Sequence, residues 1–584
     1  MWSPSLSSFS VSVLLAALQP VAAIWPAPQS LSTGSSVLYL HQNVKITYNG
    51  EHVSYTYGYA PRELTSEEVV RAGVSRTLAG IFETKFVPWK LHKPGSEWEP
   101  DLSRGQRWIE RLEIVQTGED GPGTFRPLAG QVDESYNLTV SAEGEARLAA
   151  VSSVGVLRGL ETFSQLFYQH SAGPFWYTPF APVSVRDAPK FPHRGVLIDT
   201  ARNFLPVDDI LRTIDAMAWS KLNRLHVHVT DSQSWPLVIP ALPELSAKGA
   251  YHPSQTYSPE DVEKMQRYGA ERGVEVYFEI DMPGHIGVVA LSHPELIVAY
   301  NLQPYQWWCQ EPPCGAFKLN STAVDEFLET LFDDLLPRVA PYSAYFHTGG
   351  DELNRNDSML DEGIRSNDTE VLRPLLQRFV DRQHARVRAA GLTPITWEEI
   401  PLEWEIDVAK DTVVHSWLGG DSVKTLTSKG FQVIDSNYNF WYMDCGRGQW
   451  LTWGNGVAFT QGYPFNDWCG PTKSWQLVYQ HDPTAGLTAE EAELVLGGEV
   501  ALWAETIDAV NLDTLAWPRA SVAGEVLWSG RVDPATGQNR SAVAAAPRLN
   551  EFRERLVARG VRASPIQMTF CTQGKAEECE FIVA

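Results

Sequence analysis

The sequence predicts an α/β protein in which a (β/α)8 TIM barrel is preceded by a smaller α+β domain. Three observations lead to this prediction. Eight short β-rich runs follow one another after Pro192, helical patterns lie between most of them, and polar or aromatic residues gather at the carboxyl ends of the runs. Strands that alternate with helices favour a parallel sheet, and barrels of this kind hold their active sites at the carboxyl ends of the strands.

The smaller domain comes first and has a mixed pattern. Residues 111–116 and 135–140 have the composition of strands, and residues 154–169 form an amphipathic helical pattern. Segments rich in proline separate this part from its neighbours. We assign residues 24–187 to an N-terminal α+β auxiliary domain and residues 188–584 to the (β/α)8 catalytic domain.

The barrel strands are predicted from runs rich in β-branched and aromatic residues. Residues 207–222, which follow the first run, place Ile210, Ile214 and Met217 on one face of a helix. The intervals between runs are uneven, so several loops after the strands must be long. The eight predicted strands are residues 195–201, 224–231, 274–281, 343–351, 393–399, 412–418, 432–438 and 500–505.

Residues 1–23 have the pattern of a signal peptide, because the apolar run 11–23 ends in small residues with a cleavage site near Ala23. The run is too short to span a bilayer, and no other uncharged stretch of about 18 or more residues follows. We therefore expect a secreted, extracellular protein. Five N-x-S/T sequons agree with export. They are Asn137, Asn320, Asn356, Asn367 and Asn539.

The six cysteines, an even number, suit an oxidising compartment. Proximity along the chain suggests three local bridges, although other pairings stay open. The suggested pairs are Cys309 with Cys314, Cys445 with Cys469, and Cys571 with Cys579.

Charge and composition restrict the partners. A formal net charge of −24 argues against nucleic acid, which needs basic surface, and against anionic membranes. The 21 tryptophans and 20 tyrosines either serve the core or stack on the apolar faces of sugars. A neutral substrate such as a carbohydrate fits both observations.

Thirteen polar or aromatic residues lie at or just after the carboxyl ends of the predicted strands. One such residue means little, but so many together indicate a functional face. They are Asp199, Arg202, His228, Asp231, His285, Asp351, Glu352, Trp397, Trp417, Tyr442, Asp444, Trp503 and Glu505.

Two adjacent carboxylates, Asp351 and Glu352, follow a pair of glycines in the sequence HTGGDE. Glycosidases commonly use two carboxyl groups that flank one bond, but neighbours on a strand point to opposite faces. The difficulty disappears if a 2-acetamido sugar supplies its own nucleophile, the acetamide carbonyl oxygen. One acid, protonated, then serves the departing oxygen, while the other, ionised, holds the acetamide N–H.

Two other hypotheses stay open. His226 and His228 lie on one face of a predicted strand, and His285, His347 and Asp351 follow on later strands. This set resembles the ligands of metal-dependent amidohydrolases and would suit zinc. It gives no role, however, to the second acid of the pair or to the tryptophans. The other hypothesis is an inactive sugar-binding protein built on the same barrel.

The motifs resemble those of family 20 glycoside hydrolases, the β-N-acetylhexosaminidases, and of their secreted fungal members most of all. The resemblance covers most of the mature chain, including the first domain. Besides HTGGDE, it rests on RGVLIDTARNFLP (194–206), HVHVTDSQSWPL (226–237), EIDMPGH (279–285), WEE (397–399), HSWLGG (415–420), YMD (442–444) and GGEVALWAETID (497–508).

The resemblance implies a retaining exo-β-N-acetylhexosaminidase that releases terminal GlcNAc or GalNAc from chitooligosaccharides or glycans. It implies substrate-assisted catalysis, no metal or organic cofactor, and a homodimer. Glu352 would be the general acid/base and Asp351 would orient the acetamido group. Tyr442 would hydrogen-bond the acetamide carbonyl, with Asp444 nearby.

The remaining site residues also follow from the resemblance. Trp397, Trp417 and Trp503 would wall the pocket. Asp231, His285 and His347 would tune the acid pair. Arg194 and Glu505 would bind ring hydroxyls, although Arg194 could instead form a salt bridge between the domains. Trp468 would stack on the aglycone, with Trp450, Trp453 and Trp475 close enough in sequence to compete for that role.

Overall fold

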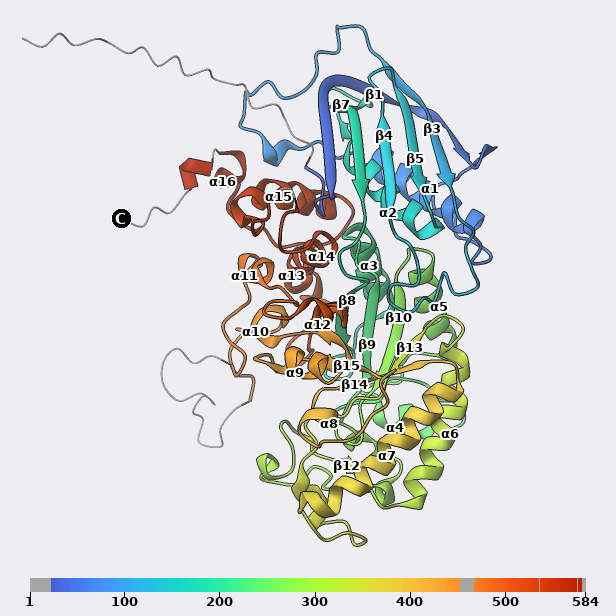
Figure 1. The fold of residues 1–584 in the computed structure, drawn as a ribbon, viewed down its shortest axis with the longest axis vertical. Coiled ribbons are helices and arrows are strands. Elements are labelled where there is room, and N and C mark those ends of the chain that lie inside the picture. Colours follow the sequence, from blue (N-terminus) through green and yellow to red (C-terminus); the bar gives the residue numbers. More distant parts are fainter. Residues whose placement is uncertain (1–22, 452–466, 535, 575, 580–584) are drawn as a thin grey trace, which may run out of the picture.

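The computed structural model describes residues 23–451, 467–534, 536–574 and 576–579, and it has the predicted fold. A sheet domain at the N-terminus packs end-on against a closed barrel (Figure 1). The predicted signal peptide, except for its last residue, lies outside the described residues. Within them, no helix combines the length and the apolar character needed to cross a membrane.

The N-terminal domain is a seven-stranded sheet with two helices packed against it, in the order β2-β1-β3-β5-β4-β7-β6. The predicted strands overlap β3 and β4, and the predicted helix overlaps α2, which Ser152 caps at its start. The helix ends at Gln165, earlier than predicted, and Tyr168 and Gln169 form β6 instead. The elements are β1 (Ser30–Tyr48), β2 (Glu51–His52), α1 (Ser66–Phe82), β3 (Trp108–Gln116), β4 (Tyr136–Val140), β5 (Glu145–Ala150), α2 (Ser153–Gln165), β6 (Tyr168–Gln169) and β7 (Trp176–Asp187).

Eight parallel strands close the barrel in sequence order, and each predicted strand overlaps one of them. The strand predicted at 343–351 ends early, at His347, because Gly349 and Gly350 turn the chain with positive φ. The strands are β8 (His193–Asp199), β9 (Arg224–Thr230), β10 (Glu275–Ile280), β13 (Tyr345–His347), β14 (Thr393–Trp397), β15 (Val413–Ser416), β16 (Gln432–Asp435) and β17 (Val495–Leu502).

Helices cover the outside of the barrel, and several loops after the strands are long, as the uneven intervals predicted. Helix α3 buries Ile210, Ile214 and Met217, the three residues expected on its inner face. The helices are α3 (Val207–Trp219), α4 (Glu244–Gly249), α5 (Pro259–Ala270), α6 (Thr322–Val339), α7 (Thr369–Ala389), α8 (Glu399–Leu402), α9 (Ser422–Ser428), α10 (Tyr438–Trp441), α11 (Trp475–Gln480), α12 (Ala489–Glu493), α13 (Leu512–Ala516), α14 (Arg519–Ser529), α15 (Ala542–Ala558) and α16 (Thr569–Gln573). A small hairpin, β11 (Ile297–Val298) and β12 (Ala316–Phe317), lies in the long loop after β10.

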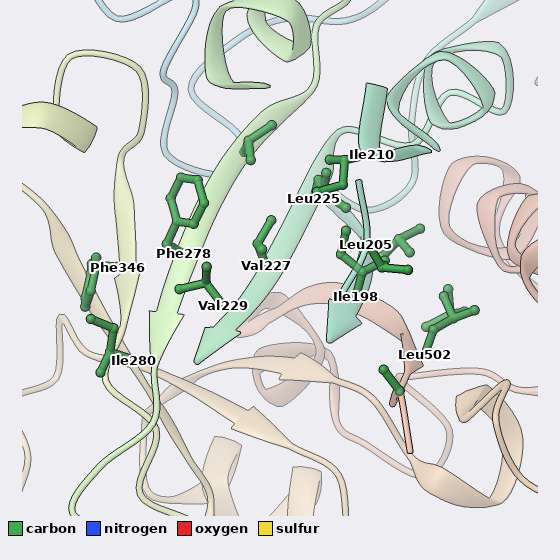
Figure 2. Close-up of a cluster of buried hydrophobic side chains, with 14 of the residues drawn as sticks. Ile198, Leu205, Ile210, Leu225, Val227, Val229, Phe278, Ile280, Phe346 and Leu502 are labelled. Carbon is green, nitrogen blue, oxygen red and sulfur yellow. The ribbon is translucent and has the colours of Figure 1, made fainter. Parts of the chain in front are cut away.

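Side chains alternate between the interior and the surrounding helices along most of the barrel, with register irregularities between β9 and β10 and between β16 and β17. In β9, Leu225, Val227 and Val229 face outward and pack with apolar residues of the neighbouring strands, such as Phe278 (Figure 2). The residues between them, His226 and His228, face the barrel interior. The barrel is therefore apolar between its strands and its helices but polar along its axis.

The structure contradicts the prediction that Arg194 binds sugar hydroxyls. Arg194 is the second residue of β8, at the amino end of the barrel, and it belongs to the outward series. Its Nη2 donates to Glu134 Oε2 of the N-terminal domain at 2.6 Å, and Arg158 Nε donates to the same oxygen at 2.8 Å. Arg194 is fully buried. It forms the salt bridge between the domains that the sequence left open.

All three suggested disulfides are present, so the pairing of the six cysteines is confirmed. The sequon asparagines lie on the surface, with one difference among them. Asn137, Asn320, Asn367 and Asn539 are exposed, whereas Asn356 is half-buried and its Nδ2 donates to the Trp307 carbonyl oxygen at 3.1 Å.

Replacing the shared carboxylate tests the interdomain cluster. Glu134→Gln should lower the free energy of unfolding by about 3–5 kcal/mol, because two buried guanidinium groups lose their counter-charge. The matched control is Glu113→Gln, which breaks an exposed ion pair with Arg147 and should cost less than about 1 kcal/mol. Urea unfolding at pH 7 measures both, and equal losses would contradict the assignment.

The effect of Glu134→Gln should also depend on pH. Burial alone would raise the pKa of Glu134, but Arg194 and Arg158 outweigh it and lower this pKa to about 2. A carboxyl group whose pKa is lowered by folding stabilises the protein above its unfolded pKa. The stability difference between wild type and variant should therefore be complete above about pH 5 and shrink as the pH falls toward 2.

Candidate active site

The turn after β13 aims the two adjacent acids in different directions. Gly349 has φ +71°, and a Cβ atom there would lie 1.8 Å from Asp281 Oδ1, so the position requires glycine. Gly350 donates its N–H to Asp281 Oδ1 at 2.9 Å, and Glu352 itself has φ +53°. Asp351 then points into the barrel beside Asp281, while Glu352 points toward His285.

Asp351 holds its proton more firmly than the sequence predicted. It is 8% exposed, and burial together with the Asp281 carboxyl raises its pKa well above the usual range. Burial likewise raises the pKa of Asp281, to about 7. Each buried carboxyl thus opposes the ionisation of the other. That Asp351 is the ionised acid of the pair stays a prediction, and an N–H donor placed against Asp351 would favour its ionisation.

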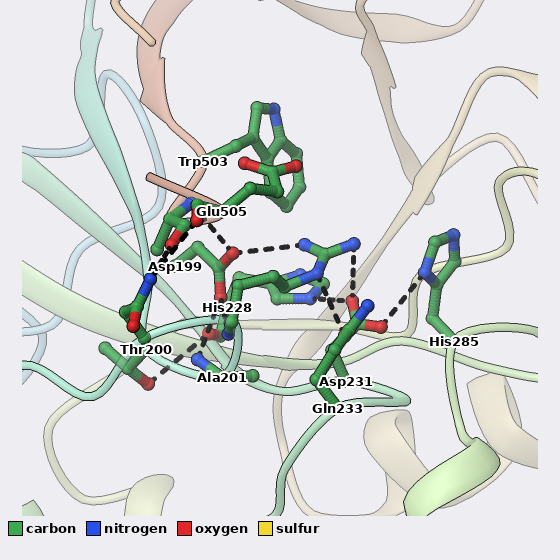
Figure 3. A network of polar contacts seen from close by, with 12 residues as sticks. Asp199, Thr200, Ala201, His228, Asp231, Gln233, His285, Trp503 and Glu505 are labelled. Atoms are coloured by element: carbon green, nitrogen blue, oxygen red, sulfur yellow. Dashed lines mark hydrogen bonds and ion pairs between the residues drawn. The ribbon is translucent and has the colours of Figure 1, made fainter. Parts of the chain in front are cut away.

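Glu352 lies at the end of a hydrogen-bonded series. His285 Nε2 is 3.3 Å from Glu352 Oε2, and His285 Nδ1 is 3.2 Å from Asp231 Oδ1. Figure 3 shows Asp231 between His285 and His228. Burial would lower the pKa of His285, but Asp231 and the neighbouring acids raise it well above its usual range. The imidazolium thus lies between two carboxyl groups and fixes the orientation of Glu352.

A cluster around Arg202 occupies the place expected of Arg194. The Arg202 guanidinium lies 3.1 Å from Asp199, 3.0 Å from Asp231 and 2.6 Å from Glu311. Burial and the Glu311 carboxylate raise the pKa of Glu505, the fifth member of the cluster, well above its usual range. Asp199 is the last residue of β8 and faces the barrel interior. Its position at the carboxyl end of the strand could have indicated from the sequence that Arg202, three residues later, lies in the site.

Aromatic side chains wall the space above the barrel axis. Trp417 and Tyr442 are nearly parallel, with ring centroids 6.2 Å apart, and Tyr442 lies 6.2 Å from Trp503. Trp397 forms the floor and donates Nε1–H to Glu279 Oε1 at 2.8 Å. We call these four residues the aromatic cup. The three tryptophans expected to wall the pocket thus lie together, with Tyr442 among them.

Trp468 stands at the rim of the cup. It is 61% exposed and lies 5.9 Å from Trp417, with the two rings almost perpendicular. Trp450 is exposed as well but has no described ring contact with the cup, and Trp475 is buried against Tyr479. The remaining competitor, Trp453, lies outside the described residues.

Two more acids adjoin the cup. Burial raises the pKa of Asp444 to about 7, and the Trp503 N–H points toward its Oδ1 at 3.5 Å. Glu399, which the sequence analysis did not single out, accepts from Trp417 Nε1 at 3.0 Å. Burial and Asp351 raise the pKa of Glu399 well above the usual range. Two buried carboxyl groups with raised pKa values therefore adjoin the cup.

The predicted metal ligands lie together but are bonded to carboxylates. His226 Nε2 is 3.0 Å from Glu279, and both ring nitrogens of His228 are engaged, with Glu279 at 2.6 Å and Asp231 at 2.7 Å. His347 Nδ1 is 2.9 Å from Glu279 as well. Ligand atoms of His226, Glu279 and His347 lie within 4.8 Å of one another, yet all three side chains are fully buried beneath the floor of the cup. The other two predicted ligands, His285 and Asp351, form a separate group with Asp281, in which the ligand atoms again lie within 4.8 Å of one another.

Barrel, aromatic cup and acid pair together define an enzyme that cleaves sugars at the carboxyl end of a (β/α)8 barrel. The family follows from comparison with known proteins. The chain belongs to glycosyl hydrolase family 20, whose catalytic domain matches residues 191–531, and a domain described as beta-acetyl hexosaminidase like matches residues 24–166. The predicted family is confirmed, and the protein is a glycoside hydrolase.

Relatives extend over nearly the whole chain. A beta-hexosaminidase of Arthroderma benhamiae is 40% identical, covering 94% of this chain and 96% of the relative. A chitooligosaccharidolytic beta-N-acetylglucosaminidase of Ostrinia furnacalis is 36% identical over 76% of this chain and 75% of that protein. The structure of a family 20 exo beta-N-acetylglucosaminidase from Vibrio harveyi shares the fold, with a TM-score of 0.70 at 20% identity over 97% of this chain and 82% of that one.

Alanine at Gly349 tests the turn that separates the two acids. Gly349→Ala should reduce hydrolysis by about 100-fold or more, because the added methyl displaces Asp281 and with it the acid pair. Gly391→Ala is the matched control, with φ +77° and open space around its Cβ position. Gly391→Ala should lose about 1–2 kcal/mol of stability from left-handed backbone, and Gly349→Ala should lose more, because its Cβ would also meet Asp281 Cα at 2.5 Å. Equal activity per folded molecule in the two variants would contradict this account of the turn.

Proposed function

We propose that this protein is a retaining exo-β-N-acetylhexosaminidase that uses the acetamido group of its substrate as nucleophile. The observation that carries the proposal is the divergence of the acid pair. Asp351 faces the barrel interior and Glu352 faces His285, so the two cannot flank one glycosidic bond as an ordinary pair does. They can serve a departing oxygen and an acetamide N–H at the same time.

Each side chain then has a chemical task. Glu352 protonates the glycosidic oxygen as the acetamide carbonyl oxygen attacks the anomeric carbon from the opposite face. Asp351 accepts the acetamide N–H and stabilises the positive charge of the oxazolinium ion. Tyr442 donates a hydrogen bond to the attacking carbonyl oxygen, with Asp444 beside it. Glu352 next deprotonates a water that attacks from the side of the departed group, so the configuration is retained.

The cup favours release of single terminal sugars. Arg202 and Glu505 stand at one end, where they would bind the hydroxyls of the non-reducing sugar, the task first assigned to Arg194. Trp397, Trp417 and Trp503 enclose the acetamido group and the sugar face, and Trp468 stacks on the aglycone at the rim. The relative from Ostrinia furnacalis is named for chitooligosaccharides, and we propose these, or glycans ending in GlcNAc or GalNAc, as substrates.

The proposal includes a secreted enzyme that needs no cofactor and works as a homodimer. The apolar run near the N-terminus, the sequons and the disulfides support export. A zinc-dependent hydrolase and an inactive sugar-binding protein are the alternatives that the test must separate.

The test compares two variants on two substrates. Glu352→Gln should lower kcat/KM for chitobiose by about 10²–10⁴-fold, and by much less for an aryl N-acetyl-β-glucosaminide whose leaving group departs without protonation. Asp351→Asn should lower both, since the acetamide is misplaced in either case. An equal effect of Glu352→Gln on both substrates would contradict its role as general acid.

Controls separate the alternatives. Wild-type activity should survive EDTA, and the aryl β-glucoside, which has a hydroxyl in place of the acetamide, should not be cleaved. Activity lost to EDTA and restored by zinc would support the metal hypothesis. Sugar binding without any turnover would support the inactive binder.

Asp281→Asn should extend activity to lower pH. The variant keeps an oxygen to accept from Gly350 N–H but removes the charge that, after burial, raises the pKa of Asp351. Asp351 would then stay ionised at lower pH, so the acid limb of kcat/KM should move to lower pH. The profile is measured with an aryl N-acetyl-β-glucosaminide from pH 3 to 8. If the acid limb stays in place in a variant with wild-type circular dichroism, Asp281 does not raise the pKa of Asp351.

A further inference from the structure

A row of alternating imidazole and carboxyl groups runs along the barrel axis to the proposed general acid. It starts at the amino end of the barrel and crosses strands β8, β17, β9 and β10 before it reaches the loops above them. Its members, in spatial order, are His193, Glu499, His226, Glu279, His228, Asp231, His285 and Glu352.

Five of the seven steps in the row are hydrogen bonds, and the other two, His226 to Glu279 and His285 to Glu352, are ion-pair contacts. From the amino end, the successive nitrogen-to-oxygen distances are 2.6, 3.2, 3.0, 2.6, 2.7, 3.2 and 3.3 Å. All side chains up to Asp231 are at most 1% exposed, and exposure rises only at His285 (11%) and Glu352 (27%). Water therefore cannot substitute for a missing member, and each charge depends on its neighbours.

His228 is the cation at the centre of the upper half of this row. It donates one N–H to Glu279 and the other to Asp231, so both nitrogens carry protons. Burial would lower its pKa, but Glu279 and Asp231 outweigh burial and raise it to about 10. Burial also opposes ionisation of Asp231, yet Arg202 and His285 hold the pKa of this carboxyl well below its usual range.

Other ionisable groups face His228 from the surrounding strands. A carboxylate oxygen of Asp281 lies within 4.8 Å of the His228 and Glu279 ligand atoms. Asp199 on β8 is the register partner of His228. Arg202 reaches Asp231 from the loop after β8. The Trp503 ring packs edge-on at 5.0 Å and closes the remaining side. Glu279 and Asp231, the two side chains that accept hydrogen bonds from His228, are both anionic and therefore favour the charged imidazolium.

We infer that His228 is a positioning residue for the reaction: by hydrogen-bonding Asp231 from below, it fixes the carboxylate that orients His285 and, through it, Glu352. Glu279 anchors His228 to the floor of the cup, because its other oxygen accepts from Trp397. Trp397 at the floor of the cup and the proposed general acid Glu352 are thus both connected to His228 through hydrogen bonds and ion pairs. This inference rests on the proposed function and adds to it a residue that touches no substrate.

Substitution of His228 by glutamine tests the inference through the pH profile. His228→Gln removes one positive charge below Asp231, so the protonated form of the His285–Glu352 unit is favoured. The alkaline limb of kcat/KM should move upward by about half to one pH unit, and kcat should fall about 10- to 100-fold with little change in KM. A purely structural role would lower the thermal midpoint without moving the limb.

His193→Gln is the matched control, because it makes the same substitution at the other end of the row. His193 is equally buried, but burial lowers its pKa despite the hydrogen bond to Glu499, so the ring is neutral. Its replacement should reduce stability and leave the alkaline limb in place. Equal limb shifts in both variants, or none in His228→Gln, would overturn the inference.

A measurement on the wild type keeps the inference testable if His228→Gln fails to fold. Neutron diffraction from crystals at pD 7 should show deuterium on both Nδ1 and Nε2 of His228, and a neutral ring would overturn the inference. Wild-type hydrolysis of the aryl N-acetyl-β-glucosaminide tests the proposed function separately. If the wild type is active but the His228→Gln limb is unmoved, only the role of His228 fails.

Discussion

Alternation of side chains along the eight parallel strands is the constraint on which the rest of this structure depends. A closed barrel has one interior, and each strand gives it every second residue. Strand β9 sends Leu225, Val227 and Val229 outward to the helices and leaves His226 and His228 inside. Because the interior excludes water, these imidazoles need charged partners, and Glu279 and Glu499 supply them. The polar axis is a consequence of the fold's geometry.

The two ends of the barrel use buried charge for different purposes. At the amino end, Arg194 and Arg158 share Glu134, and Lys221 Nζ lies 2.9 Å from Asp187 in the same interface. These pairs hold the N-terminal domain against the barrel and contact no part of the cup. At the carboxyl end, the carboxyl groups of Asp351, Asp444 and Glu505 have pKa values above their usual range and lie around the cup. The charges that join the domains and the charges of the candidate active site therefore lie at opposite ends of the barrel.

Backbone strain is concentrated around the acid pair. His285 and Glu352 both have positive φ, at 40° and 53°, although neither is glycine. Such conformations cost of order 1–3 kcal/mol and persist where surrounding contacts hold them. Here the contacts are mutual, since the two side chains form an ion pair and Asp231 holds the imidazole. The strained turns allow adjacent residues to face different parts of one substrate, which a regular strand forbids.

The sequence by itself determined the fold class, the eight strands and the family, because periodicity, spacing and motif order are local properties. It also singled out the acid pair and the three tryptophans Trp397, Trp417 and Trp503. It suggested the three disulfide pairs only by proximity, with other pairings open, and the structure decided among them. Only the tertiary structure decided which of two arginines faces the cup, because Arg194 and Arg202 lie in one motif. Arg194 is at the amino end of β8, points outward and contacts the N-terminal domain, whereas Arg202 follows the carboxyl end of β8 and contacts Asp231. Likewise, the raised pKa of Asp351 depends on Asp281, a residue of another strand. Burial and charge coupling arise from residues distant in sequence, so no local pattern contains them.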